Sequence, residues 1–198
     1  MIQFVLIFFL LIAILLVGLP VAFGLGSTAV VLALLQEHIS INFLSITVLE
    51  SLNSFTLLAV PLFVLMSQVL LTGKVGDNLF DTINAWVRHL PGGLGVATVF
   101  SCAVFAAITG SGAATAATIG MVAYPAMTRR GYDLKFTLGL LASGGTLGIL
   151  IPPSIPMILY SSITNTSLDK LFMAGIVPGI LLTLILAGYA VWRSKHGG

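Results

Sequence analysis

Two short stretches of this 198-residue sequence combine hydroxyl side chains with backbone that interrupts an apolar helix. The first is Thr109-Gly110-Ser111-Gly112, in the middle of the apolar run 94–128, with Thr115 one turn later. A helix that stops here presents unpaired carbonyls, and a helix that starts here presents unpaired N–H groups. The carbonyls of 109–111, with the hydroxyls of Ser111 and Thr115, suit a hard cation, whereas the N–H groups of 112–115 suit a carboxylate. A packing seam of small residues that binds nothing explains this composition equally well.

The second stretch is Leu150-Ile151-Pro152-Pro153-Ser154, at the end of a short helical segment. Pro152, Pro153 and the nearby Pro156 have no N–H, so a helix broken here is rich in hydrogen-bond acceptors and poor in donors. Such a break suits Na⁺ better than an anion, and Ser154 is expected to cap the helix that follows. Gly148, just before the break, allows another backbone to approach. The alternative is a proline kink without a ligand, which is common in membrane helices.

The sequence lacks the residues that a proton relay, a transition-metal site or a protease would need. No acidic or basic residue lies deep in an apolar run, which argues against a proton relay of carboxylates and against a voltage sensor. His, Cys and acidic residues show no metal-ligand spacing. Ser111 has no histidine or lysine base in a neighbouring run, which argues against an intramembrane serine protease. We therefore predict that the protein is not an enzyme and that neutral oxygens hold any coupling ion.

The elements that carry these stretches are predicted to lie in a membrane. The sequence is 58% hydrophobic and 7% charged, with a mean hydropathy of +1.15, whereas a soluble domain has about 25% charged residues. This composition excludes a soluble enzyme, a nucleic-acid-binding protein, a disulfide scaffold and a disordered tail. Helices are expected throughout, because open sheet edges are not viable in lipid. The runs without charge are 1–36, 38–49, 51–73, 89–128, 136–168 and 171–192.

The N-terminal part, 1–72, is predicted to form scaffold transmembrane helices. Helices are expected over 2–17 and 20–36, separated at Gly18-Leu19-Pro20, with a loop and a surface helix over 37–53 and a third span over 54–72. The first segment has no basic region before it and no Ala-x-Ala-like cleavage site. It is therefore interpreted as a retained transmembrane helix rather than a signal peptide.

The segment 73–93 is predicted to be an interfacial arm, because 74–90 is amphipathic. Its apolar face is formed by Val75, Leu79, Ile83 and Trp86. Its polar face carries Asp77, Asp81 and Arg88. Pro91-Gly92-Gly93 ends the helix.

The segment 94–165 is predicted to carry the transport chemistry. Each arm of 94–128 has about 16 residues, or about 24 Å, short of a hydrocarbon core of about 30 Å. Two short spans are one interpretation; a re-entrant hairpin is favoured, because the region around its tip is built of small residues. The next helix, broken at 151–154 within 136–164, spans only when its halves are taken together, which is typical of a discontinuous helix. A final transmembrane helix and a polar end occupy 166–198.

Orientation follows from the basic residues. If the hairpin enters and leaves on one side, seven Lys and Arg residues fall on that side and only Lys170 on the other. This predicts a cytoplasmic C-terminal end and an N-terminus outside. The seven are Lys74, Arg88, Arg129, Arg130, Lys135, Arg193 and Lys195.

Ordered motifs over nearly the whole chain resemble the N-terminal half of the large membrane subunit, DctM type, of tripartite ATP-independent periplasmic (TRAP) transporters. The motifs are Gly18-Leu19-Pro20-Val21-Ala22-Phe23, Leu58-Ala59-Val60-Pro61-Leu62-Phe63-Val64-Leu65-Met66, Leu90-Pro91-Gly92-Gly93-Leu94, Phe105-Ala106-Ala107-Ile108-Thr109-Gly110-Ser111, Pro125-Ala126-Met127 with Gly131-Tyr132-Asp133, Gly148-Ile149-Leu150-Ile151-Pro152-Pro153-Ser154, and Leu171-Phe172 followed by Ala174-Gly175-Ile176 and Pro178-Gly179. The family tip often reads Ser-Gly-Ser-Ser, so this chain lacks one hydroxyl but no carbonyl.

The resemblance implies an all-α polytopic membrane protein that supplies one inverted-repeat half of a sodium-driven elevator transporter for organic acids such as C4-dicarboxylates or sialic acid. It implies a bacterial inner-membrane location and Na⁺ as coupling ion without another cofactor. The implied partners are a small membrane subunit, a periplasmic solute-binding protein, the second repeat half and the lipid bilayer. The implied sodium-binding residues are Thr109, Gly110, Ser111, Gly112, Gly148, Ile151 and Pro152. Candidate substrate-binding residues are Ser111, Thr115 and Ser154.

A complete subunit of this family is about twice as long, so the chain is expected to be a split subunit, a truncated reading frame or a fragment that does not transport alone. Two other functions remain open. One is an ion exchanger of similar inverted-repeat build, and the other is a non-transporting membrane scaffold. A neighbouring gene for a secreted solute-binding protein would favour the TRAP function, and retained Na⁺ binding would disfavour the scaffold.

Overall fold

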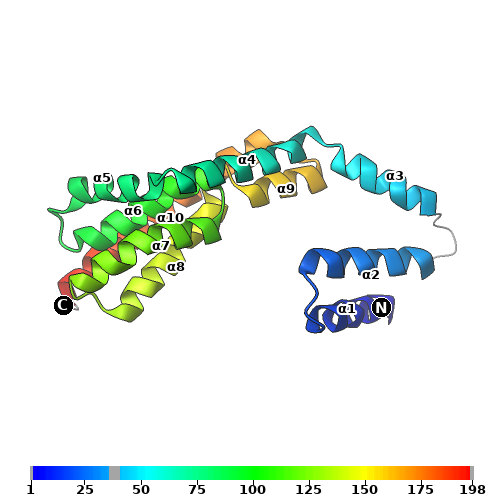
Figure 1. Cartoon of the computed structure of the whole chain (residues 1–198), viewed down its shortest axis with the longest axis horizontal. Helices are drawn as coiled ribbons and strands as arrows, with labels where there is room; N and C mark the ends of the chain where they lie inside the picture. The colour runs from blue at the N-terminus through cyan, green and yellow to red at the C-terminus, as the bar shows by residue number, and fades with distance from the viewer. Residues whose placement is uncertain (1, 36–40, 197–198) are drawn as a thin grey trace. The chain divides into compact units, whose positions relative to one another are not determined.

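The computed structural model describes residues 2–35 and 41–196, and every regular element in these ranges is an α-helix (Figure 1). The helices divide into two compact units, Met1–Asn53 and Ser54–Gly198. Glu37 and His38 of the predicted loop lie outside the described residues, as do the last two residues. The all-α prediction is therefore confirmed for the described part of the chain.

The first unit contains α1 (Ile2–Leu16), α2 (Val21–Leu35) and α3 (Ile41–Leu52). Gly18 takes a left-handed backbone with φ +86°, and Pro20 precedes α2, so the predicted separation of the first two helices is confirmed. A Cβ on Gly24 of α2 would lie 3.1 Å from the Leu15 side chain of α1, which shows how closely these helices pack. With 15 residues each, α1 and α2 are about 22 Å long.

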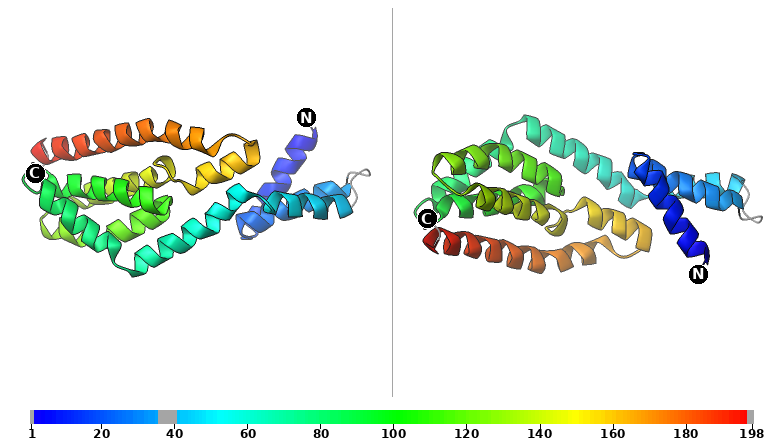
Figure 2. Two further views of the ribbon diagram at one scale, coloured as in Figure 1. Left: turned by 90° about the horizontal axis from the view of Figure 1, so that it is seen from above. Right: turned by 90° about the horizontal axis from the view of Figure 1, so that it is seen from below.

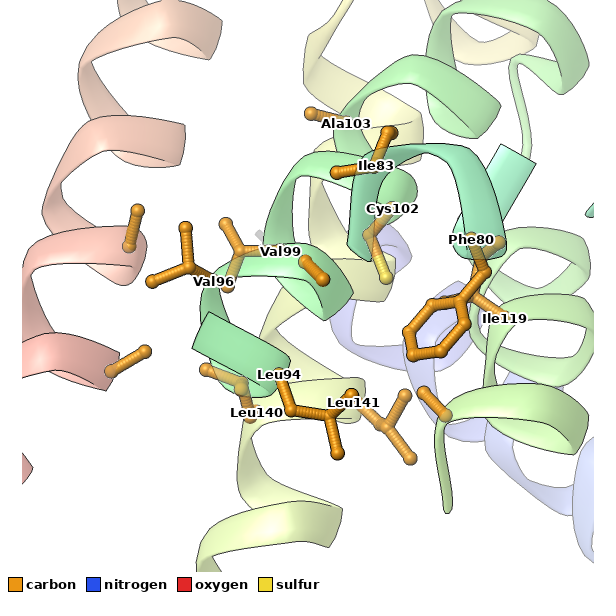
Figure 3. Close-up of a cluster of buried hydrophobic side chains, with 14 of the residues drawn as sticks. Phe80, Ile83, Leu94, Val96, Val99, Cys102, Ala103, Ile119, Leu140 and Leu141 are labelled. Carbon is orange, nitrogen blue, oxygen red and sulfur yellow. The ribbon is translucent and has the colours of Figure 1, made fainter. Parts of the chain in front are cut away.

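The second unit is built around α6 (Gly93–Thr109), which packs against α5 (Val75–Val87), α7 (Gly112–Arg129), α8 (Leu134–Leu150) and α10 (Leu168–His196) (Figure 2). Helices α4 (Phe55–Thr72) and α9 (Ile155–Thr164) pack against each other. Most side chains of α6 are buried, because its many Ala, Gly, Ser and Thr residues let four neighbours approach. Its larger residues, Leu94, Val99 and Cys102, join Phe80 of α5, Ile119 of α7 and Leu140 of α8 in one core (Figure 3).

Three helical segments of the described residues are long and apolar enough to cross a membrane. They are Phe55–Thr72, Leu134–Thr164 and Leu168–His196, and the second of them comprises α8, the break and α9. Their outward side chains are large and apolar: Phe55 is 92% exposed, and Leu62 and Leu181 are more than half exposed. Such surface is stable only against lipid, so the chain is a multi-pass integral membrane protein.

Helix α5 is amphipathic, and part of its predicted apolar face packs inside the bundle while the rest stays exposed. The buried residues are Gly76, Phe80 and Ile83, whereas Trp86 is 72% exposed and Leu79 is only half-buried. At Gly76 a Cβ would overlap the Thr118 side chain of α7. The buried face of α5 packs on α6 and α7, and the exposed Trp86 is free to meet the membrane surface, so the predicted interfacial position stays a prediction.

Candidate functional site

The hairpin formed by α6 and α7 turns within two residues. Gly110 takes a left-handed conformation with φ +60°, and its N–H donates to the carbonyl of Ala106 at 2.8 Å, which ends α6. Ser111 is extended and caps α7, its Oγ accepting from the N–H of Ala114 at 3.4 Å. The predicted end of one helix and start of another at 109–112 is therefore confirmed. We call residues 109–112 the hairpin tip.

A non-helical stretch, 151–154, separates α8 from α9, as the prolines predict. We call it the break. The N–H of Ile151 donates to the carbonyl of Leu147 at 2.8 Å, and this is the last helical hydrogen bond of α8. In a continuous helix the next donors would be residues 152 and 153, but proline has no N–H. The carbonyls of Gly148 and Ile149 therefore lose their helical donors.

The Ser154 hydroxyl replaces one of these two missing donors. Its Oγ donates to the carbonyl of Ile149 at 2.8 Å, five residues earlier. The prediction that this side chain caps α9 is wrong, because Ser154 occupies the N-cap position without a side-chain cap hydrogen bond. The physical reason is that a carbonyl in a membrane-spanning segment needs a donor, and the Ser154 hydroxyl supplies it.

The hairpin tip and the break are in direct contact. The carbonyl of Gly110 accepts from the N–H of Ile155 at 3.3 Å. A Cβ on Gly110 would lie 2.8 Å from the Pro153 carbonyl oxygen, and one on Gly148 would lie 2.6 Å from the Ser111 carbonyl carbon. The close backbone approach predicted at Gly148 is therefore confirmed, and the backbone that approaches is the hairpin tip.

A further pair of glycines extends this contact along α7 and α8. A Cβ on Gly112 would lie 2.7 Å from the carbonyl oxygen of Gly145, and one on Gly145 would lie 2.9 Å from the Cβ of Ala116. Backbone meets backbone at these positions, so only glycine fits. The small residues of the hairpin thus serve to bring the two interruptions together.

The carbonyls of the tip already accept hydrogen bonds. That of Thr109 accepts from Ser67 Oγ of α4 at 3.2 Å, and that of Ser111 accepts from Thr115 N at 3.0 Å and Thr115 Oγ1 at 2.8 Å. The two threonine hydroxyls lie 3.1 Å apart, and that of Thr109 also donates to the carbonyl of Phe105 at 3.0 Å. A carbonyl oxygen has two lone pairs, so the carbonyls of Thr109 and Gly110, which accept one hydrogen bond each, can also contact a cation, whereas that of Ser111 already accepts two.

Ser67 was not among the residues that the sequence singled out. It is a hydroxyl in the middle of a long apolar span, and it is buried although α4 is otherwise mostly exposed. It donates to two carbonyls, those of Phe63 at 2.8 Å and Thr109. Thr109 lies 42 residues away along the chain, so no local sequence pattern predicts this contact.

The predicted sodium residues gather where the tip meets the break, but their side chains differ in surroundings. The side chains of Ile151 and Pro152 line an apolar groove of about 480 Å³ between α6 and α10, with Phe100, Val104, Ile180 and Leu184. Ile151 also contacts Gly179 of α10. Only the backbone of these two residues is therefore available to an ion.

The three predicted substrate-binding residues also differ in how exposed their side chains are. The side chains of Thr115 and Ser154 are fully buried, and both hydroxyls donate to carbonyls of this chain. Ser111 is only half-buried. Of the three, Ser111 alone presents side-chain surface in this structure.

Residues 8–198 match the family described as "Tripartite ATP-independent periplasmic transporter, DctM component". The chain is 46% identical to the C4-dicarboxylate TRAP transporter large permease protein DctM of Pseudomonas aeruginosa, over 82% of this chain and 38% of that protein. It is 39% identical to the protein of the same name from Vibrio cholerae, over 96% of this chain and 43% of that protein. It is 32% identical to the sialic acid TRAP transporter large permease protein SiaM of Vibrio cholerae, over 90% of this chain and 42% of that protein.

The chain spans less than half the length of these relatives. The matched region nevertheless includes both interruptions, from the first scaffold helix to the end of α10. The chain therefore belongs to the DctM family of tripartite ATP-independent periplasmic transporters.

Proposed function

We propose that the chain forms one inverted-repeat half of a sodium-coupled permease subunit that imports organic acids. The observation that carries this proposal is the contact between the hairpin tip and the break, where Gly110 bonds to Ile155 and Gly148 meets the Ser111 backbone. Two interrupted helices that meet inside a membrane protein are the usual setting for ion sites in secondary transporters. Family membership supports the transport role of this contact.

The ion is Na⁺, held mainly by backbone carbonyls of the tip and the break. Proline at 152 deprives the Gly148 carbonyl of its helical donor, while the carbonyls of Thr109 and Gly110 keep one lone pair each. Carbonyl dipoles gathered in a medium of low dielectric repel one another, and a cation relieves this repulsion. The site needs no carboxylate, which agrees with the absence of charged residues between Arg88 and Arg129 in the sequence.

The substrate class is an organic anion, for which C4-dicarboxylate has the strongest support. Relatives named for C4-dicarboxylate transport are 46% and 39% identical to the chain, and the one named for sialic acid is 32% identical. In this proposal Ser111 contacts the substrate, together with residues of the second repeat half, while the buried Thr115 and Ser154 support the tip and the break behind it. A periplasmic solute-binding protein delivers the substrate, and a small membrane subunit completes the complex in the bacterial inner membrane.

The hairpin is re-entrant in this proposal, and its tip stops within the membrane. Helix α6 has 17 residues, or about 25 Å, which is short of a hydrocarbon core of about 30 Å. The tip is covered by α4 through Ser67 and by the break through Ile155, as an irregular backbone in a membrane requires. A cysteine at Ser111, in a Cys102→Ala background, should resist an impermeant thiol reagent added from outside. Labelling as fast as that of a cysteine in an external loop would exclude the re-entrant hairpin.

The sodium site is tested by Gly148→Ala, with Gly139→Ala as the matched control. Both glycines lie in α8, but a Cβ at 148 would collide with the backbone of the tip, whereas one at 139 has open space around it. Each variant is combined with the second repeat half and the small membrane subunit in proteoliposomes. Uptake of a C4-dicarboxylate is then measured against Na⁺ concentration, with the binding protein present.

We expect Gly148→Ala to raise the Na⁺ concentration for half-maximal uptake at least tenfold, and Gly139→Ala to leave it unchanged. An unchanged Na⁺ dependence in Gly148→Ala would show that no sodium site exists at this contact. Uptake that needs no Na⁺ in the unaltered protein would overturn the sodium coupling itself.

A further inference from the structure

A second polar site lies at the opposite end of the bundle from the hairpin tip. It is a pocket of about 310 Å³ between the turn that joins α7 to α8 and the last turns of α10. Its lining residues are Arg130, Gly131, Tyr132, Asp133, Phe136, Arg193 and Ser194. None of these residues belongs to the tip, the break or the groove beside them, so the proposed transport chemistry does not account for the pocket.

The α7–α8 turn holds its side of the pocket in one conformation. The N–H of Gly131 donates to the carbonyl of Thr128 at 3.0 Å, and that of Tyr132 donates to the carbonyl of Met127 at 3.2 Å. With Gly131 at φ +78°, this pair of bonds is the Schellman motif that ends many helices. It places Arg130 and Tyr132 on either side of a fixed glycine.

The α10 side of the pocket is fixed by the turn that precedes α6. A Cβ on Gly92 would lie 2.8 Å from both the Ala190 carbonyl oxygen and the Ser194 Cβ. This contact holds the end of α10, and with it Arg193, against the bundle. The two arginines of the pocket therefore come from elements that are far apart in the sequence and independently anchored.

The pocket has an excess of positive charge. Within the described residues, neither the Arg130 nor the Arg193 guanidinium has a carboxylate at ion-pair distance. The acidic side chain of the lining is Asp133, and its Oδ2 already accepts from the N–H of Phe136 at 3.1 Å at the start of α8. The site thus offers two unpaired guanidinium groups to an anion.

A row of aromatic rings marks the level of this pocket relative to lipid. Successive ring centroids lie 6.1 Å apart for Tyr132 and Phe136, 5.9 Å for Phe136 and Tyr189, and 6.1 Å for Tyr189 and Trp192. Aromatic residues of this kind gather at the headgroup level of membrane proteins. Counted back from the pocket along α10, the exposed apolar side chains start about one turn before Tyr189, with Ile185 and Leu184.

We propose that this pocket binds the phosphodiester headgroup of an anionic phospholipid. Arg130 and Arg193 contact the phosphate oxygens, Ser194 lies beside them as a hydroxyl donor, and the acyl chains lie along the exposed apolar surface of α10. A soluble phosphate ester shares the same anionic chemistry. The lipid is the ligand that the site favours, because the pocket adjoins both an aromatic row and an apolar, membrane-facing helix.

The test measures lipid binding to the full chain in detergent by native mass spectrometry, with phosphatidylglycerol or phosphatidylcholine added at equal concentrations. The test variant is Arg130→Gln with Arg193→Gln. The matched control is Arg129→Gln with Lys195→Gln, which removes the same charge from neighbouring exposed positions that do not line the pocket. Circular dichroism melting shows whether each variant remains folded.

We expect the unaltered chain to prefer phosphatidylglycerol, and the test variant to bind it at least about thirtyfold more weakly, because two charge-assisted contacts to the phosphate are lost. The control should change this affinity by less than about threefold, since its charges lie outside the pocket and make no such contact. Equal binding of the two lipids by the unaltered chain would overturn the proposal. Equal losses in the two double variants would also overturn it, because they would indicate general attraction rather than a site.

A second arm separates the lipid from a soluble anion. Glycerol phosphate, added in large excess over phosphatidylglycerol, should fail to displace the lipid, because it makes no contact with the apolar surface of α10. Complete displacement at a concentration near that of the lipid would assign the pocket to a soluble phosphate ester and exclude the lipid proposal.

Discussion

The hairpin tip and the break are both helix interruptions, yet their backbone carbonyl oxygens differ in the hydrogen bonds that they accept. At the tip, a left-handed glycine and a capping serine reverse the chain, and the carbonyls of residues 109–111 all accept hydrogen bonds from Ser67, Ile155 or Thr115. At the break, two prolines remove donors, and a single hydroxyl, that of Ser154, replaces one of them. Glycine thus interrupts a helix and keeps its backbone N–H as a donor. Proline has no N–H, so it leaves helical carbonyl acceptors without a partner. The break is therefore the side of the contact where an ion gains most.

The largest effect on this contact is expected from Gly110→Ala. A Cβ there meets the Pro153 carbonyl oxygen at 2.8 Å, and the φ of +60° also disfavours any side chain. The two costs together should lower the free energy of unfolding by about 2–5 kcal/mol, measured by denaturant titration in detergent. Gly131→Ala is the control, because its φ of +78° carries the same strain while nothing lies within 4 Å of the added Cβ. If the two variants are equally destabilised, the contact between tip and break contributes nothing.

Ser154→Ala should have the next largest effect, since it removes the hydroxyl that serves the Ile149 carbonyl. The Ile149 carbonyl, which lies in a membrane-spanning segment, then lacks a donor, and the free energy of unfolding should fall by about 1–3 kcal/mol in the same titration. Thr146→Ala is the comparison, because its hydroxyl bonds to the Ser143 carbonyl inside α8, and that carbonyl keeps its helical donor when the hydroxyl is lost. An equal effect of the two changes would show that Ser154 does not compensate for the prolines.

Ser111→Ala should act more on the ion than on the fold. The hydroxyl makes a long cap bond of 3.4 Å to Ala114, so its loss should cost under about 1 kcal/mol of stability. In the assembled transporter, Na⁺ affinity should weaken by about 1–2 kcal/mol, the scale of one contact to a charge, and should not be abolished. The Na⁺ dependence of uptake measures this. A complete loss of Na⁺ dependence would indicate that side chains, rather than carbonyls, hold the ion.

Ser67→Ala should have the smallest effect. It removes one donor from the Thr109 carbonyl, at a distance of 3.2 Å, and should lower the free energy of unfolding by about 1 kcal/mol. Because this frees a lone pair at the tip rather than removing a ligand, Na⁺ affinity should hold or rise slightly. A clear fall in Na⁺ affinity would mean that the Ser67 bond orients the Thr109 carbonyl toward the ion.

Both interruptions were predictable because each depends on residues that are adjacent in the sequence. Gly110 with Ser111, and Pro152 with Pro153, interrupt apolar runs in ways that few other residue pairs do. What the interruptions bond to was not predictable from the same signals. The acceptor of Ser154 depends on which carbonyl the prolines leave without a donor, and Ser67 reaches its partner through the packing of α4 on α6.

The face of α5 shows a second reason why some contacts were not predictable from the sequence. Hydrophobic periodicity weighs side chains by size, so it gave weight to Trp86 and none to Gly76. In the structure Gly76 lets α7 approach closely, because the missing side chain leaves room for Thr118. Small residues decide where helices touch in this bundle, and a pattern that counts apolar bulk does not register them.

The burial of Phe80 and Ile83 has a mechanical consequence for the unit that contains the hairpin. Since α5 is packed on both α6 and α7, the three helices are expected to travel together in any large displacement of the hairpin. In the proposed transport cycle, Gly73–Lys74 is the candidate hinge, because Lys74 holds a left-handed φ of 56° between α4 and α5. The hydrogen bond from Ser67 to Thr109 joins the two sides of this turn, so in that cycle it would break when the hairpin moves away from α4.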